Sequence, residues 1–115
     1  MKLLGSKGED LAAGFLKEKG YKIISRNYKT PIGEVDIIAE DKGTIVFVEV
    51  KTRTNDSYGY PFEAVGARKQ HKLKNLALLY MKQKKKEFAV RFDVLSIHIS
   101  NGKKEIEHIM DAFEV

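Results

Sequence analysis

The sequence predicts a single α/β domain, residues 1–115, in which a mixed β-sheet is flanked by helices. Two stretches carry apolar residues at helical spacing, from about Lys7 to Lys19 and from about Ala67 to Lys84. The stretches between and after them are rich in β-branched residues and are separated by short turn signals. The predicted element order is therefore α-β-β-β-α-β-β.

The first helix is predicted from its ends as well as from its apolar stripe. The segment from Ser6 to Glu9 has the form of a capping box, in which a hydroxyl precedes a carboxylate by three residues. Gly20 follows the last periodic residue and suits the position just after a helix end. A strand from about Tyr21 to Tyr28 comes next.

A strand–helix–strand unit occupies the middle of the chain and predicts two parallel strands joined by a right-handed crossover. Residues 55–66, before its helix, are predicted to form a loop. The second strand of the unit runs from about Phe88 to Ile99, and Asn101-Gly102 is a strong signal for a two-residue turn. A short strand from about Lys104 to Ile109 then completes the sheet.

Composition narrows the classes of function. The absence of cysteine excludes disulfides, thiolate metal sites and cysteine nucleophiles. A net charge of +5 and a pI of about 9.3 favour polyanionic partners, although many basic proteins bind none. The apolar runs are too short to cross a bilayer, and Leu3-Leu4 is too short for a signal peptide. We therefore expect a cytoplasmic protein with no membrane partner.

Two β-rich runs, Glu34–Glu40 and Thr44–Lys51, flank Lys42-Gly43 and predict a hairpin. With Lys42-Gly43 as the loop residues, every cross-strand pair matches in character, whereas a slip of one residue would set charges against apolar side chains. A bulge at Gly43 would shift one strand by one residue. The predicted pairs are Ile38–Phe47, Asp36–Glu49 and Glu34–Lys51 on one face, and Ala39–Val46, Ile37–Val48 and Val35–Val50 on the other.

This register would set the carboxylates of Asp36 and Glu49 side by side, with Cβ atoms about 4.5–5.5 Å apart. Like charges so close repel unless a cation offsets them or one pKa rises. Lys51 on the same face is one candidate cation and Mg²⁺ is the other, since Mg²⁺ is commonly held by carboxylates, water and substrate phosphate. Such a site supports phosphodiester hydrolysis. The alternative is a salt-bridge cluster on a solvated face, which the neighbouring Ile38 and Phe47 disfavour.

The spacing of the PD-(D/E)xK nuclease signature is present in Gly33-Glu34-Val35-Asp36, followed after twelve residues by Glu49-Val50-Lys51. Further motifs are Gly5-x-x-Gly8-Glu9, Val46-Phe47-Val48-Glu49-Val50-Lys51-Thr52-Arg53 and Arg91-Phe92-Asp93-Val94. Over nearly its full length the chain resembles the YraN family of bacterial proteins, which is similar to archaeal Holliday-junction resolvases. Val35 departs from the proline of the signature, at a position that varies widely in such enzymes.

The resemblance implies a restriction-endonuclease-like fold and a Mg²⁺- or Mn²⁺-dependent endonuclease. By this resemblance Asp36 and Glu49 match metal-binding acids, Lys51 matches the catalytic lysine, and Glu9 matches a helix glutamate that completes the catalytic and metal site. It also implies structured or branched DNA as substrate, rather than RNA, and a homodimer, because cutting two strands needs two sites. Glu9 fits a capping box as well, and Glu34 is either a further ligand or a partner of Lys51.

A basic group formed by Arg53, Arg68, Lys69 and Lys72 follows the predicted site strand and opens the second helix. Phosphate binding is one interpretation of this group, and a solvated helix surface is the other. The predicted loop carries three aromatic residues that either stack on bases or seal the core. These residues are Tyr58, Tyr60 and Phe62.

The leading hypothesis is a metal-dependent endonuclease. A rival is a nucleic-acid-binding module that retains the nuclease fold without cutting, which the acids and Lys51 disfavour because phosphate binding needs no carboxylate pair. A third hypothesis is a protein with no nucleic-acid partner, whose basic charge only aids solubility. Away from the site, Arg91 and Asp93 are expected to form a structural pair, and the three histidines, which lack ligand spacing, are given no role.

Overall fold

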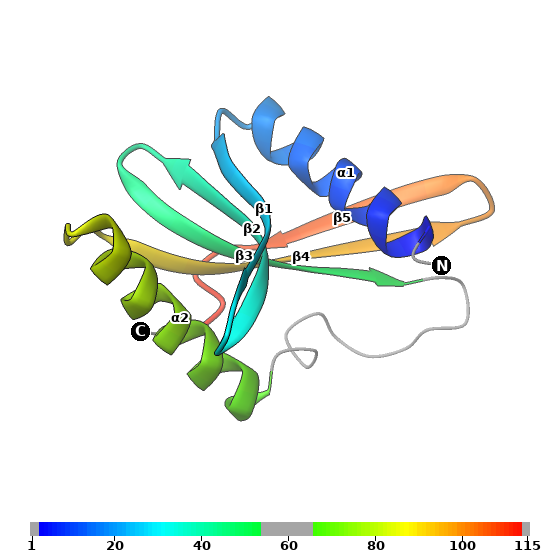
Figure 1. The fold of residues 1–115 in the computed structure, drawn as a ribbon. Coiled ribbons are helices and arrows are strands. Elements are labelled where there is room, and N and C mark those ends of the chain that lie inside the picture. Colours follow the sequence, from blue (N-terminus) through cyan, green and yellow to red (C-terminus); the bar gives the residue numbers. More distant parts are fainter. Residues whose placement is uncertain (1–2, 54–65, 114–115) are drawn as a thin grey trace.

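The computed structural model describes residues 3–53 and 66–113, with side chains from Lys7 onward (Figure 1). Its element order is the predicted α-β-β-β-α-β-β. Apart from Gly66, the predicted loop lies outside the described residues, and so do its three aromatic side chains. The elements are α1 (Leu3–Glu18), β1 (Lys22–Thr30), β2 (Gly33–Asp41), β3 (Thr44–Arg53), α2 (Ala67–Lys84), β4 (Val90–Ser100) and β5 (Lys103–Ile109).

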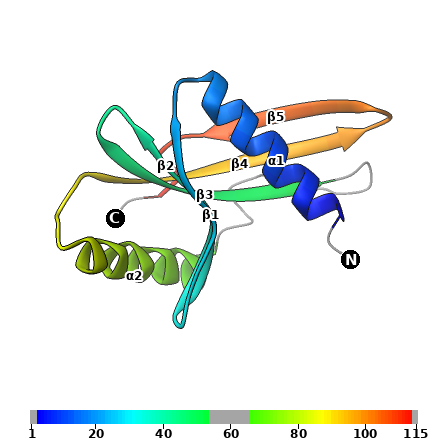
Figure 2. The ribbon, with the colours of Figure 1, turned by 45° about the horizontal axis from the view of Figure 1, so that its top comes forward.

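The strands form one mixed sheet in the order β1-β2-β3-β4-β5. Neighbouring strands are antiparallel except β3 and β4, which are parallel and are connected by α2, as predicted. Helix α1 covers one face of the sheet and α2 covers the other, as Figures 1 and 2 show from two directions. The fold therefore has three layers, with β3 in the middle of the central one.

Each helix encloses its own half of the hydrophobic core. The buried residues of the α1-side core are Ala12, Ala13, Leu16, Tyr21, Ile37, Ala39, Val46, Val48, Leu95 and Ile97. The buried residues of the α2-side core are Val35, Ile38, Ile45, Phe47, Leu73, Leu76, Ala77, Tyr80, Phe92 and Val94. Successive residues of β3 alternate between the two cores, which explains why this strand is apolar on both faces.

Helix α1 begins earlier than the sequence predicts. It starts at Leu3, so Ser6 lies inside the helix and cannot be its N-cap. The capping-box interpretation of Ser6 and Glu9 is therefore wrong. The predicted end is confirmed, because Gly20 has φ of 92° and its N–H donates to the carbonyl of Lys17 at 3.0 Å.

The N-terminal half of α1 lies close to the end of β3. A Cβ atom placed on Gly8 would stand 2.0 Å from Oγ1 of Thr52, so only a residue without a side chain permits this approach without a shift. Glu9 follows directly and lies three and four residues before Ala12 and Ala13, on the stripe of α1 that faces the sheet.

The β2–β3 hairpin has the predicted register near its turn. Lys42 and Gly43 are the loop residues, with φ of 49° and 89°, as a type I′ turn requires. The paired residues run from Asp41–Thr44 to Ile37–Val48. This part of the hairpin prediction is confirmed, and it excludes a bulge at the turn.

Strands β2 and β3 diverge beyond the Ile37–Val48 pair. Asp36, the next residue of β2, therefore has no backbone-paired partner on β3. The alternation along β2 breaks at Asp36, because Ile37 belongs to the α1-side core while Val35 and Ile38 both belong to the α2-side core. The prediction that Val35 and Ile37 share a face is therefore wrong. Asn27 of β1, at the facing position, has φ of 53°, and the register of β1 against β2 shifts between Ile23 and Ser25. Figure 2 shows the β1–β2 hairpin turned away from β3, and the β2–β3 ladder ends at the Ile37–Val48 pair, so the two strands form a fork that begins at Asp36.

A buried ionic cluster lies at the start of β4. The Asp93 carboxylate accepts hydrogen bonds from Nε of Arg91 at 2.9 Å, from Nε2 of His108 at 2.7 Å and from the backbone N–H of Asp111 at 3.0 Å. Burial alone would raise the pKa of Asp93, but these donors hold it below its ordinary value. The predicted Arg91–Asp93 pair is confirmed. His108 has a structural role in this cluster, and its Nδ1 lies 2.8 Å from Nζ of Lys19.

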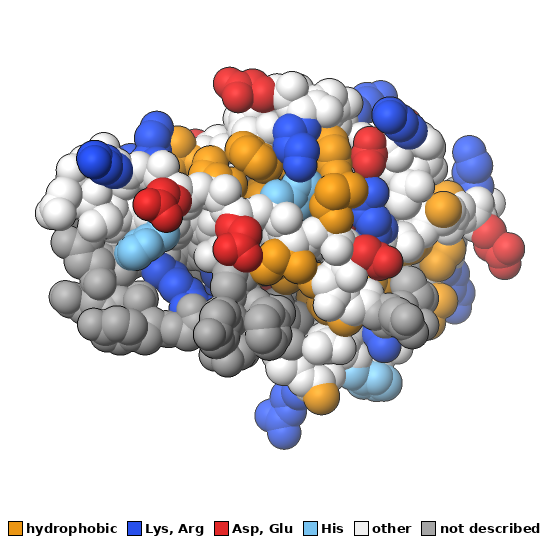
Figure 3. Space-filling view, turned by 180° about the vertical axis from the view of Figure 1, so that it is seen from behind, with side chains coloured by type: hydrophobic (Ala, Val, Ile, Leu, Met, Phe, Trp, Pro, Cys, Tyr) orange, Lys and Arg blue, Asp and Glu red, His pale blue; other side chains and the backbone are white. Residues whose placement is uncertain are grey.

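The surface seen from behind in Figure 3 carries charges of both signs. Lys and Arg side chains alternate there with Asp and Glu side chains around small groups of hydrophobic residues. The net charge of +5 is therefore not gathered on the described part of this face. Within residues 3–53 and 66–113, neither helix is both long and apolar enough to cross a membrane.

Candidate active site

The fork between β2 and β3 places the Asp36 side chain against the edge of β3. Its Oδ2 accepts a hydrogen bond of 2.8 Å from the backbone N–H of Val50. The predicted cross-strand pair of Asp36 and Glu49 is therefore not a backbone-paired one, because a side chain of β2 takes up the hydrogen bonding where the ladder stops. At this position a side-chain contact replaces the backbone ladder and holds the Asp36 carboxylate in place.

Glu49 lies next to Val50 and is only 5% exposed. Burial, followed by the hydrogen bond and the charge of the Asp36 carboxyl group, raises the pKa of Glu49 to about 7. The Lys69 ammonium acts in the opposite direction but does not cancel these effects. The two acids therefore interact closely, as the sequence predicted.

Two ammonium groups accompany the acids. Nζ of Lys69 forms an ion pair with Oε2 of Glu49, yet this buried oxygen has no well-aligned hydrogen-bond donor among the described residues. Burial, followed by the nearby charge of Lys69, lowers the pKa of Lys51. Burial would also lower the pKa of Lys69, but the Glu49 carboxylate outweighs it and the pKa is raised.

These side chains line a cavity of about 660 Å³, which we call the site cavity. Its size is in the range of small-molecule sites, about 300–1,000 Å³. Its sheet side carries the acids together with Lys51 of β3, and its α2 side carries basic residues and no acid. The residues that line it are Gly33, Glu34, Asp36, Glu49, Val50, Lys51, Gly66, Arg68, Lys69, Lys72, Leu73 and Leu76.

A divalent cation fits the acidic side of this cavity. Asp36 and Glu49 supply carboxylate oxygens, and Oε2 of Glu49 is buried without a well-aligned donor. Mg²⁺ is commonly held by one or two carboxylates, with water and substrate phosphate completing its shell. No group of three or more Asp, Glu, His or Cys side chains suited to an ion occurs in the described part of the chain. Asp36 and Glu49 could hold such a cation only together with oxygens from water or a substrate.

The remaining predicted site residues have different positions. Glu34 is exposed at the rim of the site cavity. Glu9 is half-buried on α1, across the sheet from α2, and is absent from the described lining, so its catalytic and metal-binding role stays a prediction. Arg53 ends β3 and is likewise absent from that lining, whereas Arg68 and Lys72 are in it.

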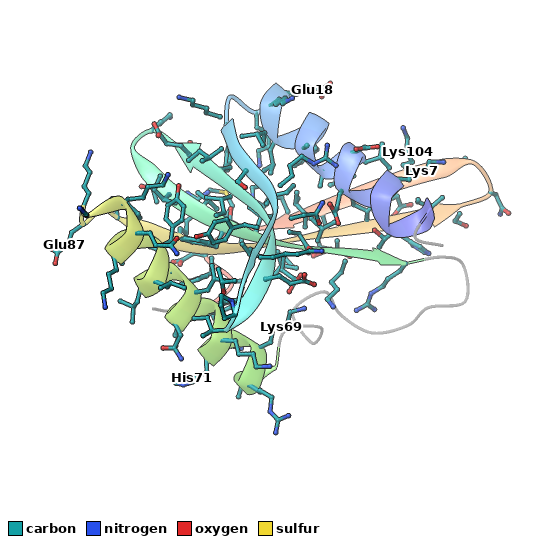
Figure 4. The ribbon with its side chains drawn as sticks, viewed as in Figure 1. Lys7, Glu18, Lys69, His71, Glu87 and Lys104 are labelled. Carbon is teal, nitrogen blue, oxygen red and sulfur yellow. The ribbon has the colours of Figure 1, made fainter. Side chains whose placement is uncertain are left out.

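The sequence predicts Lys69 as a member of the basic group but does not predict its ion pair with Glu49. Figure 4 shows Lys69 extending from the first turn of α2 toward the sheet, whereas His71 points away from it. One signal in the sequence pointed to this contact. The first turn of α2 has basic residues and no acidic one, which is unfavourable for the helix dipole unless an acid lies opposite.

The fold and the site together define the class of this protein. A mixed sheet between two helices, with a pair of acids and a lysine where two central strands diverge, is a restriction-endonuclease-like fold. The chain belongs to the uncharacterised protein family UPF0102, the YraN family, whose model matches residues 8–97.

Several relatives are similar over nearly their whole length. A UPF0102 protein of Thermodesulfovibrio yellowstonii is 52% identical over 110 residues, which are 96% of this chain and 95% of the relative. A UPF0102 protein of Geobacter metallireducens is 50% identical over 115 residues, which are 99% of this chain and 94% of the relative. A third, from Syntrophomonas wolfei, is 50% identical over 111 residues, 96% of each chain.

Proposed function

We propose that this protein is a metal-dependent endonuclease that hydrolyses phosphodiester bonds with Mg²⁺ or Mn²⁺. The observation that carries the proposal is the close pair of carboxyl groups, Asp36 and Glu49, on the floor of a cavity whose opposite wall is basic. Repulsion between such acids is costly in a metal-free sheet. Pure nucleic-acid binding would give no reason to hold this pair beside a phosphate.

Each residue of the site has a chemical part in this reaction. Asp36, fixed by the Val50 N–H, and Glu49 would hold a divalent cation through their carboxylate oxygens. When bound, such a cation would supply polarisation of the phosphoryl oxygen and a lowered pKa of water. Lys51 lines the same cavity, and its ammonium neutralises charge that develops on the phosphoryl group.

The basic wall suits the phosphates that flank the cleaved bond. Arg68 and Lys72 line the site cavity from α2 and are exposed, so both can reach a phosphodiester backbone. Their contacts with phosphate would position the strand without reading its sequence. Structured or branched DNA is the substrate class that the resemblance to junction resolvases favours, and a homodimer would supply two sites for cutting two strands.

The test compares cleavage of branched, duplex and single-stranded DNA in the presence of Mn²⁺. We expect the wild-type protein to cut at least one of them, and Asp36→Asn and Lys51→Ala to abolish cutting. Lys82→Ala is the matched control, because Lys82 is exposed in the last turn of α2 and does not line the site cavity. Salt-dependent binding without cleavage would contradict the proposal and favour the silent binding module. The absence of both binding and cleavage would favour the third hypothesis, a protein with no nucleic-acid partner.

A further inference from the structure

The ion pair between Lys69 and Glu49 lies where a cation would sit. Glu49 is buried, and Oε2, the oxygen that Lys69 contacts, is the one without a well-aligned hydrogen bond. The charge of Asp36 also raises the pKa of Lys69, by less than the contacts with Glu49 and Lys51 do. The Lys69 ammonium thus forms an ion pair with Glu49 and is stabilised by the charge of Asp36, and these two acids are the residues proposed to hold the divalent ion.

The position of Lys69 in α2 is unfavourable by local rules. Gly66, the N-cap residue of α2, has no side chain that could cap the helix, and the first turn has no acidic residue. Basic side chains at a helix N-terminus oppose the helix dipole. Departures from local preference are expected where a side chain serves a site. In this structure, the acid pair opposite α2 compensates for that repulsion.

Phosphate binding alone does not explain this arrangement. Arg68 and Lys72, on either side of Lys69, are exposed and line the same cavity. Lys69 is half-buried, and its ammonium points toward the sheet rather than toward solvent (Figure 4). A lysine kept only for phosphate would gain nothing from an ion pair that turns its ammonium toward a buried acid.

We propose that Lys69 is the internal counter-cation of the metal site, which occupies the place of the divalent ion in the metal-free protein and must leave Glu49 for that ion to bind. This inference rests on the proposed function, because it takes Asp36 and Glu49 as the ligands. Two consequences follow. Lys69 lowers the affinity for the ion by competing with it, and the ion frees the Lys69 ammonium to face the substrate phosphate.

The test measures the dissociation constant for Mn²⁺ without DNA, by calorimetry and by the electron paramagnetic resonance signal of free Mn²⁺. Lys69→Met removes the charge and keeps the length of the side chain. We expect it to bind Mn²⁺ about tenfold more tightly than the wild type, equivalent to about 1.4 kcal/mol. Lys69→Arg, which retains the competing charge, should stay close to wild type, as should Lys82→Met.

Each outcome of this comparison either supports or overturns the role of Lys69. An unchanged or weaker affinity in Lys69→Met, with Mn²⁺ binding in the wild type, overturns the role of Lys69 and leaves the metal-dependent nuclease standing. Mn²⁺ binding by Lys69→Met but not by the wild type supports the role of Lys69 and contradicts metal use by the wild type. Absence of binding in both overturns both proposals. A tighter Lys69→Met with a wild-type-like Lys82→Met supports the inference.

Discussion

Replacing Glu49 by glutamine should stabilise the metal-free protein above neutral pH. The pKa of Glu49 is raised from 4.5 to about 7 by burial and by Asp36. Its stabilising contribution is therefore complete below about pH 4.5 and is lost as the pH rises through about 7. At about 1.4 kcal/mol per pKa unit, the total loss is about 3 kcal/mol. Glutamine cannot ionise, so Glu49→Gln should exceed the wild type by about 2 kcal/mol at pH 8, after allowance for the lost Lys69 ion pair.

The assay is urea unfolding followed by far-ultraviolet circular dichroism in EDTA, at several values between pH 5 and pH 8. We expect the free energies of unfolding of wild type and Glu49→Gln to be close at pH 5 and to separate steadily as the pH rises. Glu87→Gln is the matched control, because Glu87 is exposed beyond the end of α2. Parallel pH profiles for wild type and Glu49→Gln, or a less stable variant at pH 8, would refute the reasoning about the acid pair.

Three further predictions concern the core and the site. Asp93→Ala should lower the free energy of unfolding by about 3 kcal/mol, measured by urea unfolding, because it leaves His108 and the Asp111 N–H without their acceptor and Arg91 with only one carboxylate partner, Asp41. An unfolding midpoint like that of the wild type would contradict this. Lys51→Met should lower the single-turnover cleavage rate by about 10²–10³ without changing the Kd for DNA, if its ammonium acts on the transition state. Joint replacement of Arg68 and Lys72 by alanine should reduce the slope of log K against log salt by about 2, measured by fluorescence anisotropy, if each contacts one phosphate.

The sequence was sufficient to predict the order of the elements and most of the hairpin. Lys42-Gly43 has the chemistry of a type I′ turn, and the alternation of apolar residues next to it leaves one acceptable register. The parallel pair of β3 and β4 follows from the length of the crossover that holds α2. These features are local or are fixed by connectivity, which is why pattern alone reaches them.

The alternation of apolar residues along β2 did not predict the fork at Asp36. The run from Val35 to Ile38 shows no glycine or proline at the break, so period-2 alternation continued through it in the prediction. The irregularity depends on the neighbouring strand, where Asn27 adopts a positive φ that asparagine tolerates better than most residues. The acids came together as predicted, but through a side-chain contact with Val50 rather than a regular ladder.

The contact of Lys69 with Glu49 was also missed, for a different reason. Lys69 lies on a helix 20 residues after Glu49 in the chain, and only the packing of α2 on the sheet decides which of its basic residues turns inward. Helical periodicity identifies the buried stripe, with Leu73, Leu76 and Tyr80, and leaves the residues at its margin ambiguous. The ion pair with the buried Glu49 decides that Lys69 is the basic residue that turns inward.

The most direct test of the shared carboxylate site is a crystal structure of the protein grown with Mn²⁺, read through the anomalous signal of the ion. We expect one strong peak in the site cavity, at coordination distance from oxygens of both Asp36 and Glu49, with the Lys69 ammonium moved off Glu49. Peaks bound by only one of these acids, or located outside the site cavity, would contradict it.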